Sequence, residues 1–149
     1  MTIIRKATLA DVPVIVSMSA RFYPTTHYAD WCEMDEASVA GLATGLIEND
    51  VFFVAERDGE LVGMIGLMVA PFLFNQNRKF AVEIVWWVAP DARGSRIASQ
   101  LLAVVEQPCR DAGADRIQMV HMPNSPPQAA ALYRHAGYAE SEISFTKDL

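Results

Sequence analysis

The chain is poor in cysteine and in basic side chains. Its 149 residues include two cysteines, Cys32 and Cys109, which lie far apart and fit neither a Cys-x-x-Cys pair nor a zinc spacing. Both are expected to be reduced packing residues rather than bridge partners or nucleophiles. Twelve Lys and Arg against 18 Asp and Glu give a net charge of −6. This charge argues against a nucleic-acid partner, which requires a basic surface, and is compatible with a cationic one.

Long apolar runs and nucleotide-binding glycine motifs are also missing. The longest uncharged stretch, Leu61–Asn77, contains glycine and proline and is shorter than the roughly 18 apolar residues of a membrane span. No Gly-x-Gly-x-x-Gly or Gly-Lys-Ser/Thr motif occurs, which argues against Rossmann and P-loop folds. The histidines, His27, His121 and His135, lack metal-ligand spacing, so we expect no metal. Early charged residues interrupt any signal-peptide core, which predicts a cytoplasmic protein without a membrane partner.

The length and the 52% hydrophobic content fit one domain that spans residues 1–149. Hydrophobic periodicity and turn residues predict an ordered series of elements. They are a strand at Ile3–Thr8, helices at about Thr8–Phe22 and Val39–Ile47, strands at Val51–Glu56, Leu61–Phe72 and Phe80–Ala89, a helix at Ile97–Ala112, a strand at Ile117–Met122, a helix at Ala129–Ala136 and a strand within Tyr138–Leu149. This order predicts a mixed α/β (α+β) sheet with helices on both faces.

Local signals mark several boundaries. Asp58-Gly59 between two apolar runs is a strong hairpin signal. Thr8 and Asp11 form a capping-box-like helix start. Pro108 should kink or end the helix that contains it, because proline lacks the backbone N–H. Ser125 is expected to cap the last helix, with a proline at its first position.

The segment from Trp87 to Leu102 is the most informative part of the chain. An apolar strand breaks at a Pro-Asp turn, passes through an Arg-Gly loop and enters a helical pattern. Such a loop brings free backbone N–H groups, the positive end of a helix dipole and nearby arginines to one point. An isolated Arg-Gly is more often part of an ordinary strand-loop-helix connection with a surface arginine, but these surroundings predict a phosphate site.

This loop resembles the acetyl-CoA pyrophosphate loop of the GNAT superfamily of N-acetyltransferases, whose pattern is Gln/Arg-x-x-Gly-x-Gly/Ala. Arg93 matches the first position and Ala98 the last, and Arg96 stands where the middle glycine is expected. The segment Ala129–Tyr138 resembles the Ala-x-x-x-Tyr-x-x-x-Gly-Phe/Tyr helix of the same superfamily. The resemblance implies a GNAT-like, mostly antiparallel sheet, acetyl-CoA as co-substrate, and a homodimer as an oligomeric state compatible with the family.

The resemblance also implies which residues bind acetyl-CoA. They lie at the strand end, in the loop and before the last helix: Val88, Ala89, Arg93, Gly94, Ser95, Arg96, Ile97, Ala98, Ser99 and Asn124. A backbone N–H at the strand end is a candidate donor to the thioester carbonyl. Asn124 has a second interpretation, as a plain turn residue before Ser125.

Tyr133 and Glu83 are the candidate catalytic residues. An amine with a pKa of about 10.4 must lose its proton, which at pH 7 costs roughly 4.6 kcal/mol. Glu83 is the single charged residue in its apolar strand and is the candidate base, unless it is a sheet-edge residue that points to solvent. Tyr133 matches the tyrosine that faces the CoA sulfur in many GNAT enzymes and is the candidate acid. Its alternative role is a core tyrosine whose hydroxyl binds the backbone.

Aromatic residues crowd the connection between the first two helices, where GNAT proteins often wall the acceptor site: Phe22, Tyr23, His27, Tyr28 and Trp31. They equally fit a satellite core under a long loop. Phe72 and Phe74 are candidates for the opposite wall. The leading hypothesis is direct transfer of acetyl from acetyl-CoA to a primary amine of a small molecule or peptide. The alternatives are an acyl-CoA-binding regulatory module without turnover and a protein-interaction domain that keeps only the fold.

Overall fold

The computed structural model describes residues 1–149 and contains one five-stranded sheet in the order β1-β2-β3-β4-β5. Its strands are β1 (Thr2–Lys6), β2 (Val51–Arg57), β3 (Glu60–Phe72), β4 (Asn75–Val88) and β5 (Ala114–Gln118). β1 to β4 pair in antiparallel fashion, and β5 runs parallel to β4. This confirms the predicted mixed, mostly antiparallel sheet.

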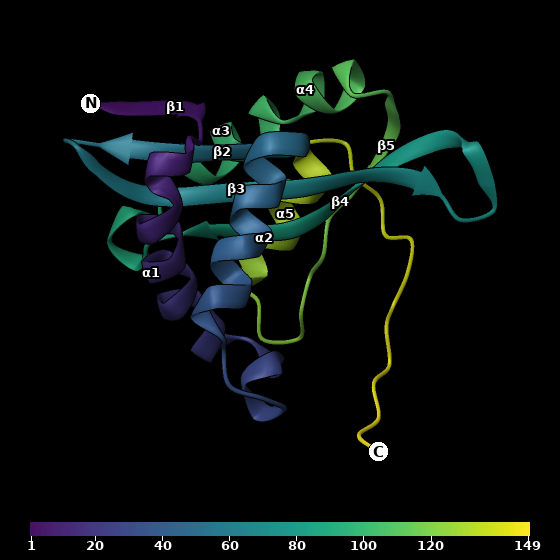
Figure 1. Ribbon diagram of the computed structural model, residues 1–149, viewed down its shortest axis with the longest axis horizontal. Helices are drawn as coiled ribbons and strands as arrows, with labels where there is room; N and C mark the ends of the chain where they lie inside the picture. Colours follow the sequence, from purple (N-terminus) through teal and green to yellow (C-terminus); the bar gives the residue numbers. More distant parts are fainter.

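Helices cover both faces of the sheet (Figure 1). The α-helices are α1 (Val12–Phe22), α2 (Glu36–Asn49), α3 (Ile97–Val104), α4 (Glu106–Asp111) and α5 (Pro127–His135). Short 3₁₀ turns are η1 (Leu9–Asp11), η2 (Tyr23–Thr25), η3 (His27–Asp30) and η4 (Pro90–Ala92). α1 and α2 lie side by side on one face, and α3 and α5 lie behind the sheet. None of these helices is long and apolar enough to cross a membrane.

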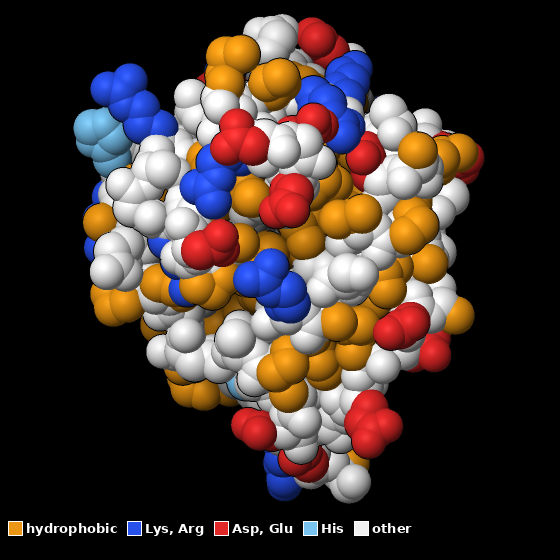
Figure 2. All heavy atoms as spheres, turned by 90° about the vertical axis from the view of Figure 1, so that its left-hand side faces the viewer, with side chains coloured by type: hydrophobic (Ala, Val, Ile, Leu, Met, Phe, Trp, Pro, Cys, Tyr) orange, Lys and Arg blue, Asp and Glu red, His pale blue; other side chains and the backbone are white.

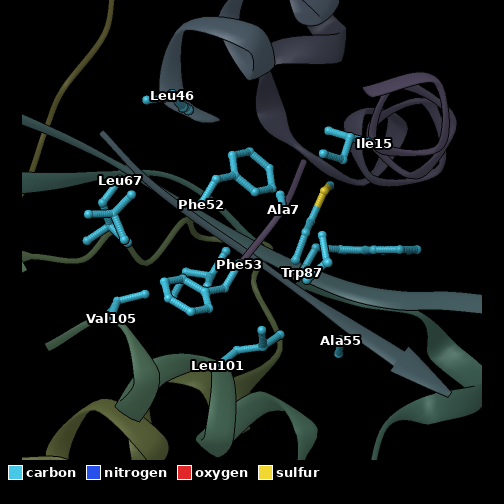
Figure 3. Packing of buried hydrophobic residues seen from close by; sticks show 14 of the residues in the cluster. Ala7, Ile15, Leu46, Phe52, Phe53, Ala55, Leu67, Trp87, Leu101 and Val105 are labelled. Carbon is cyan, nitrogen blue, oxygen red and sulfur yellow. The ribbon is translucent and has the colours of Figure 1, made fainter. Parts of the chain in front are cut away.

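The core fills both sides of β2. Phe52 points toward α1 and α2, whereas Phe53 points toward Leu101 of α3 (Figure 3). This follows from the alternation of side chains along a strand. On β3, Gly66 leaves room for the Phe52 ring, because a Cβ atom there would lie 2.9 Å from two of the ring carbons.

Local sequence signals account for several boundaries. Asp58 and Gly59 have φ of 54° and 84°, as a tight turn between β2 and β3 requires. The backbone N–H of Thr8 donates to the Asp11 carboxylate (2.7 Å) at the start of η1, before α1 begins. α3 ends at Val104, the residue whose carbonyl would need an N–H from Pro108, and α4 then starts a separate turn.

Three predicted boundaries and one predicted strand were wrong. β4 begins at Asn75 rather than Phe80, because it continues the long hairpin with β3. β5 spans Ala114–Gln118 instead of Ile117–Met122, since pairing with β4 stops at Gln118. α5 starts at Pro127 with Pro126 at its N-cap, and Ser125 caps nothing, because its hydroxyl accepts from Met122 N–H. Residues 138–149 form no strand, because no neighbouring strand pairs with them.

Candidate active site

A cavity of about 960 Å³ opens where β4 and the chain after β5 separate. β4 and β5 pair only over Lys79–Val82 of β4, and beyond Val82 no hydrogen-bonded ladder joins β4 to the chain that follows β5. The second half of β4, the loop before α3, residues 120–126 and α5 form the walls. Phe22, Thr25 and Tyr28, from α1 and the turns that follow it, also line the cavity.

A bulge in β4 decides which side chains share the cavity face. The register of β4 against β3 shifts by one residue between Glu83 and Val85, which leaves Ile84 as the extra residue. A bulge of this kind reverses the alternation of the side chains that follow it. Glu83 therefore lies on the same face of the sheet as Trp86 and Val88, and this is the face on which Trp86 meets α5.

Glu83 is half-buried in the cavity wall and does not point to solvent. Its Oε2 accepts a hydrogen bond from the backbone N–H of Val120 (2.7 Å). Burial raises the pKa of Glu83 to about 7, and the hydrogen bond from Val120, which favours the charged form, only partly opposes this. A carboxyl group with this pKa exchanges protons near neutral pH, as a general base must.

Tyr133 lies on α5 and also lines the cavity. Its hydroxyl donates to the carbonyl oxygen of Val120 (2.8 Å), and its ring packs against Trp86 at a centroid distance of 5.0 Å. Burial, together with the charge of Glu83, raises the pKa of Tyr133 well above its usual range, so the hydroxyl keeps its proton. The geometry combines both sequence interpretations: the hydroxyl binds the backbone, yet the side chain faces the cavity.

The loop before α3 presents unpaired backbone N–H groups. Those of Gly94, Ser95 and Arg96 have no acceptor within the chain, and neither have those of Ala98 and Ser99 in the first turn of α3. Gly94 has φ of 79°, which a glycine adopts without strain. The loop is held by the hydroxyl of Ser95, which donates to Ala92 O (2.7 Å). This combination of free donors and a helix N-terminus suits a pyrophosphate.

Arg93 and Arg96 differ in how they are held. Arg93 lines the cavity, and its Nε donates to the carbonyl oxygen of Val88 (3.0 Å), which fixes the guanidinium beside the end of β4. Arg96 is exposed, forms no ion pair, and has φ of −80° and ψ of −1°. Because this is ordinary helical backbone, the loop does not require glycine at position 96.

Val88 and Ala89 present their backbone groups in opposite directions. The N–H of Ala89 donates to Val62 O (2.8 Å) in β3, so it is not available to a thioester carbonyl. Backbone groups of successive strand residues alternate, so the N–H of Val88 faces the open side of β4. Of the two, Val88 alone can serve as the predicted strand-end donor.

Asn124 sits in the turn between β5 and α5. The turn is closed by the bond from Ser125 N–H to Met122 O (2.9 Å), as the turn interpretation expected. The side-chain amide of Asn124 donates to the carbonyl oxygen of Thr25 in η2. Asn124 therefore ties the segment after β5 to the segment after α1. This contact lies at the end of the cavity that is lined by the aromatic residues Phe22 and Tyr28.

The predicted acceptor wall is only partly present. Phe22 and Tyr28 line the cavity, and the Tyr23 hydroxyl holds the turn in place by donating to Cys32 O (2.6 Å). Trp31 is 74% exposed and is not among the lining residues. Phe72 and Phe74 lie at the tip of the β3–β4 hairpin and pack on each other, so their prediction as the opposite wall was wrong.

Two important positions were not predicted. Trp86 packs against Tyr133 and has a buried indole N–H without a hydrogen-bond partner. Val120 contributes its backbone N–H and carbonyl to Glu83 and Tyr133. No sequence signal marks the bulge at Ile84 that sets the face of Trp86. The side-chain type of Val120 likewise does not reveal the contacts that its backbone makes. No group of three or more His, Cys, Asp and Glu side chains is arranged to hold a metal ion.

Comparison with known proteins gives consistent matches. The model of the acetyltransferase (GNAT) family matches residues 15–138. An aminoalkylphosphonate N-acetyltransferase from Salmonella typhimurium is 37% identical over 111 residues, which are 73% of this chain and 70% of that protein. An aminoglycoside N(6')-acetyltransferase type 1 from Stenotrophomonas maltophilia is 29% identical over 147 residues, 93% of this chain and 87% of that protein.

Solved structures share the fold. A crystal structure of a predicted acetyltransferase with acetyl-CoA from Clostridium acetobutylicum superimposes with a TM-score of 0.76. The match covers 99% of this chain and 96% of the other, at 16% sequence identity.

Proposed function

The chain belongs to the acetyltransferase (GNAT) family and is an N-acetyltransferase, and on this basis we propose that its cavity transfers acetyl from acetyl-CoA to the primary amine of a small molecule. The observation that carries the proposal is the position of Glu83. This carboxyl group, with a pKa of about 7, lies in the wall of the cavity that also reaches the free N–H groups of the loop before α3.

We propose that the loop holds the pyrophosphate of acetyl-CoA through the N–H groups of residues 94–99 and the side chains of Arg93 and Arg96. The dipole of α3 adds to this attraction. The pantetheine arm would then follow the open edge of β4, where the N–H of Val88 is directed. This places the thioester near Glu83 and Tyr133 and leaves the end with Phe22, Thr25 and Tyr28 for the acceptor.

Glu83 takes the role of general base in this proposal. It removes a proton from the acceptor ammonium, directly or through a water, and the free amine attacks the carbonyl carbon of the thioester. The C–N bond forms, the nitrogen releases its second proton to solvent, the C–S bond breaks, and the thiolate leaves with the electron pair of that bond. Because a carboxylate with a pKa near 7 is a stronger base than an ordinary glutamate, proton removal from the ammonium costs less free energy.

Tyr133 takes the role of general acid. Its raised pKa keeps the hydroxyl protonated, so a proton is available for the departing thiolate, and the proton that Glu83 took from the ammonium replaces it on Tyr133. To deliver it, the hydroxyl must exchange the Val120 carbonyl for the CoA sulfur as acceptor.

The charge around the acceptor end favours a cationic substrate. The connection from Tyr23 to Glu36 carries four acidic residues and neither lysine nor arginine. In Figure 2, mostly acidic side chains gather at the lower end of the molecule, the level at which both η3 and the C-terminal end lie in Figure 1. Of the acceptor types named for the two relatives, an aminoglycoside fits this charge better than an anionic aminoalkylphosphonate.

We also infer that residues 1–149 form one catalytic domain, because a single core cluster links strands and helices on both faces. A cytoplasmic location is proposed as well, since it supplies acetyl-CoA and keeps Cys32 and Cys109 reduced. The alternative, an acyl-CoA-binding module without turnover, rested on the Arg96 that replaces the usual loop glycine, and the ordinary helical backbone at Arg96 removes that reason.

The test is an acceptor screen with release of free CoA thiol as the readout. Acetyl-CoA is offered with aminoglycosides, polyamines, amino acids, peptides and aminoalkylphosphonates, alongside the Glu83→Gln variant. Amine-dependent thiol release that is lost in Glu83→Gln supports the proposal. Calorimetric binding of acetyl-CoA with no thiol release from any amine would instead support the module without turnover.

A further inference from the structure

One hydrogen bond joins two sides of the cavity at its acceptor end. The side-chain amide of Asn124, in the turn before α5, donates to the carbonyl oxygen of Thr25 in η2. Both residues line the cavity, although they lie 99 positions apart in the chain. No other hydrogen bond joins residues 23–32 to β4, residues 120–126 or α5. The tie across the cavity therefore depends on the Asn124 side chain.

Residues 23–32 have few other contacts that hold them in place. They form the short 3₁₀ turns η2 and η3, which pack mainly on α1 and on each other. Short 3₁₀ turns have poorer hydrogen-bond geometry than α-helices, and segments with few buried contacts open readily. Tyr28 and Trp31 of this segment are 44% and 74% exposed. A bond from the opposite wall therefore adds substantially to the order of these turns.

The segment that carries Asn124 is firmly held. Its turn is closed by two bonds between Met122 and Ser125, of 2.9 and 3.0 Å, and two prolines follow. Proline fixes the backbone φ angle, which limits the freedom of this turn further. The same segment contains Val120, whose backbone binds both Glu83 and Tyr133. Asn124 thus anchors the acceptor turns to the stretch of chain that holds the candidate base and acid.

The direction of the Asn124 amide separates it from the cofactor. The amide is bound to η2, which lies beside the aromatic wall, whereas the groups suited to pyrophosphate are the N–H groups of the loop before α3. Asp30 of η3 and Glu33 belong to the same connection as η2 and contribute to its negative charge. The bond therefore orders the part of the chain whose charge and aromatic rings suit a cationic amine.

We propose that Asn124 is a positioning residue for the acceptor: its bond to Thr25 holds η2 and η3 against the cavity and sets the affinity for the amine rather than for acetyl-CoA. The inference rests on the proposed function, since it takes the end lined by Phe22 and Tyr28 as the acceptor site. Without the bond, the closed arrangement of the turns is populated less in the free protein. The apparent affinity of the amine falls by the same fraction, because the amine binds only the closed arrangement.

Hydrogen exchange of the free protein tests the tie without any substrate. Asn124→Ala should raise the exchange rates of the bonded amides of Thr26, Trp31 and Cys32 about fivefold, the factor that corresponds to one neutral hydrogen bond. Asn49→Ala is the matched control, because its amide also donates to a backbone carbonyl, that of Gly45 (3.2 Å), on α2 and outside the cavity lining. Unchanged exchange in Asn124→Ala, or equal changes in both variants, would overturn the proposal.

Steady-state kinetics with an amine found in the acceptor screen test the role in the reaction. In Asn124→Ala the acceptor KM should rise about fivefold, whereas kcat at saturating amine and the calorimetric Kd of acetyl-CoA should stay unchanged. Asn49→Ala should alter none of the three. A higher Kd of acetyl-CoA with an unchanged acceptor KM would assign Asn124 to the cofactor and contradict the inference.

Failure of the inference is distinct from failure of the proposed function. Normal turnover with an unchanged acceptor KM in Asn124→Ala overturns the inference alone. An unmodified chain that acetylates no amine overturns the proposed function, and the acceptor role of Asn124 is lost with it.

Discussion

Glu83 and Tyr133 are held by the two backbone groups of one residue. Glu83 accepts from the N–H of Val120, and Tyr133 donates to its carbonyl oxygen, at 2.7 and 2.8 Å. The candidate base, on a strand, and the candidate acid, on a helix, are thus fixed relative to each other by a backbone that follows β5. A shift of this backbone changes both side chains together, so their effects on catalysis should be coupled.

The pH dependence of activity should report Glu83. Because the carboxyl group acts as a base only after losing its proton, kcat/KM should rise with pH through a limb centred near 7. In Glu83→Gln this limb should vanish, and the acceptor ammonium alone should then determine the increase, at higher pH. A limb near 7 that persists in the variant would assign it to another group.

Glu83 should also make the free energy of unfolding depend on pH, and this free energy should fall with rising pH where activity increases. Glu83 has a pKa raised from 4.5 to about 7 in the folded state, so folding favours its protonated form. Relative to Glu83→Gln, the free energy of unfolding of the unmodified chain should therefore fall as pH rises from about 4.5 to 7 and level off above. Urea titrations across this range measure the difference, and parallel curves would contradict the raised pKa.

Tyr133→Phe keeps the ring packing on Trp86 and removes only the hydroxyl. If the hydroxyl protonates the thiolate, kcat should fall by roughly 10² to 10⁴, with little change in acetyl-CoA affinity. If it serves only the Val120 carbonyl, the loss should be about 1 kcal/mol of stability with kcat retained. Single-turnover kinetics of a normally folded variant distinguish the two roles.

Arg93→Glu should weaken binding of acetyl-CoA. A charge-assisted contact with phosphate contributes on the order of 1.5 to 3 kcal/mol, so the dissociation constant should increase at least tenfold. Arg110→Glu on α4, away from the cavity lining, is the matched control for the change in net charge. Calorimetry that gives the same affinity for both variants would remove Arg93 from the phosphate site.

Gly66→Ala should destabilise the fold by about 1 to 3 kcal/mol, because its Cβ would lie 2.9 Å from carbons of the Phe52 ring. Gly45→Ala is the control: its Cβ meets nothing within 4 Å, and alanine is a better helix former than glycine at this position inside α2. The denaturant concentration at the unfolding midpoint should therefore fall in Gly66→Ala and rise in Gly45→Ala.

Local patterns predicted most of the elements, and long-range pairing decided what they missed. The Asp58-Gly59 turn and the break before Pro108 depend on the residues themselves, so they were readable. The end of β5 and the conformation of the tail depend on a neighbouring strand, which no local pattern supplies. The strand pattern of Ile143 and Phe145 is real, but a strand forms only where an edge accepts it.

The candidate site was predictable where chemistry requires a particular side chain. Glu83 stood out as a charge within an apolar strand, and Tyr133 through its motif. Trp86 was missed because its face depends on the bulge at Ile84, and Val120 because it acts through its backbone. Phe74 was misplaced because the β3–β4 hairpin is longer than the apolar runs suggested.

The bulge at Ile84 separates Glu83 and Trp86 by three positions in the chain while keeping both on one face of β4. Deleting Ile84 would therefore restore regular pairing, with Glu83 still opposite Leu67 and Val85 still opposite Gly66, and would leave Trp86 beside Tyr133. Closing the bulge without a deletion would instead turn Trp87 to the face that Trp86 now occupies. Related chains that are one residue shorter here should keep the same aromatic partner for Tyr133, and an alignment that places the gap elsewhere in β4 would equate residues on opposite faces of the sheet.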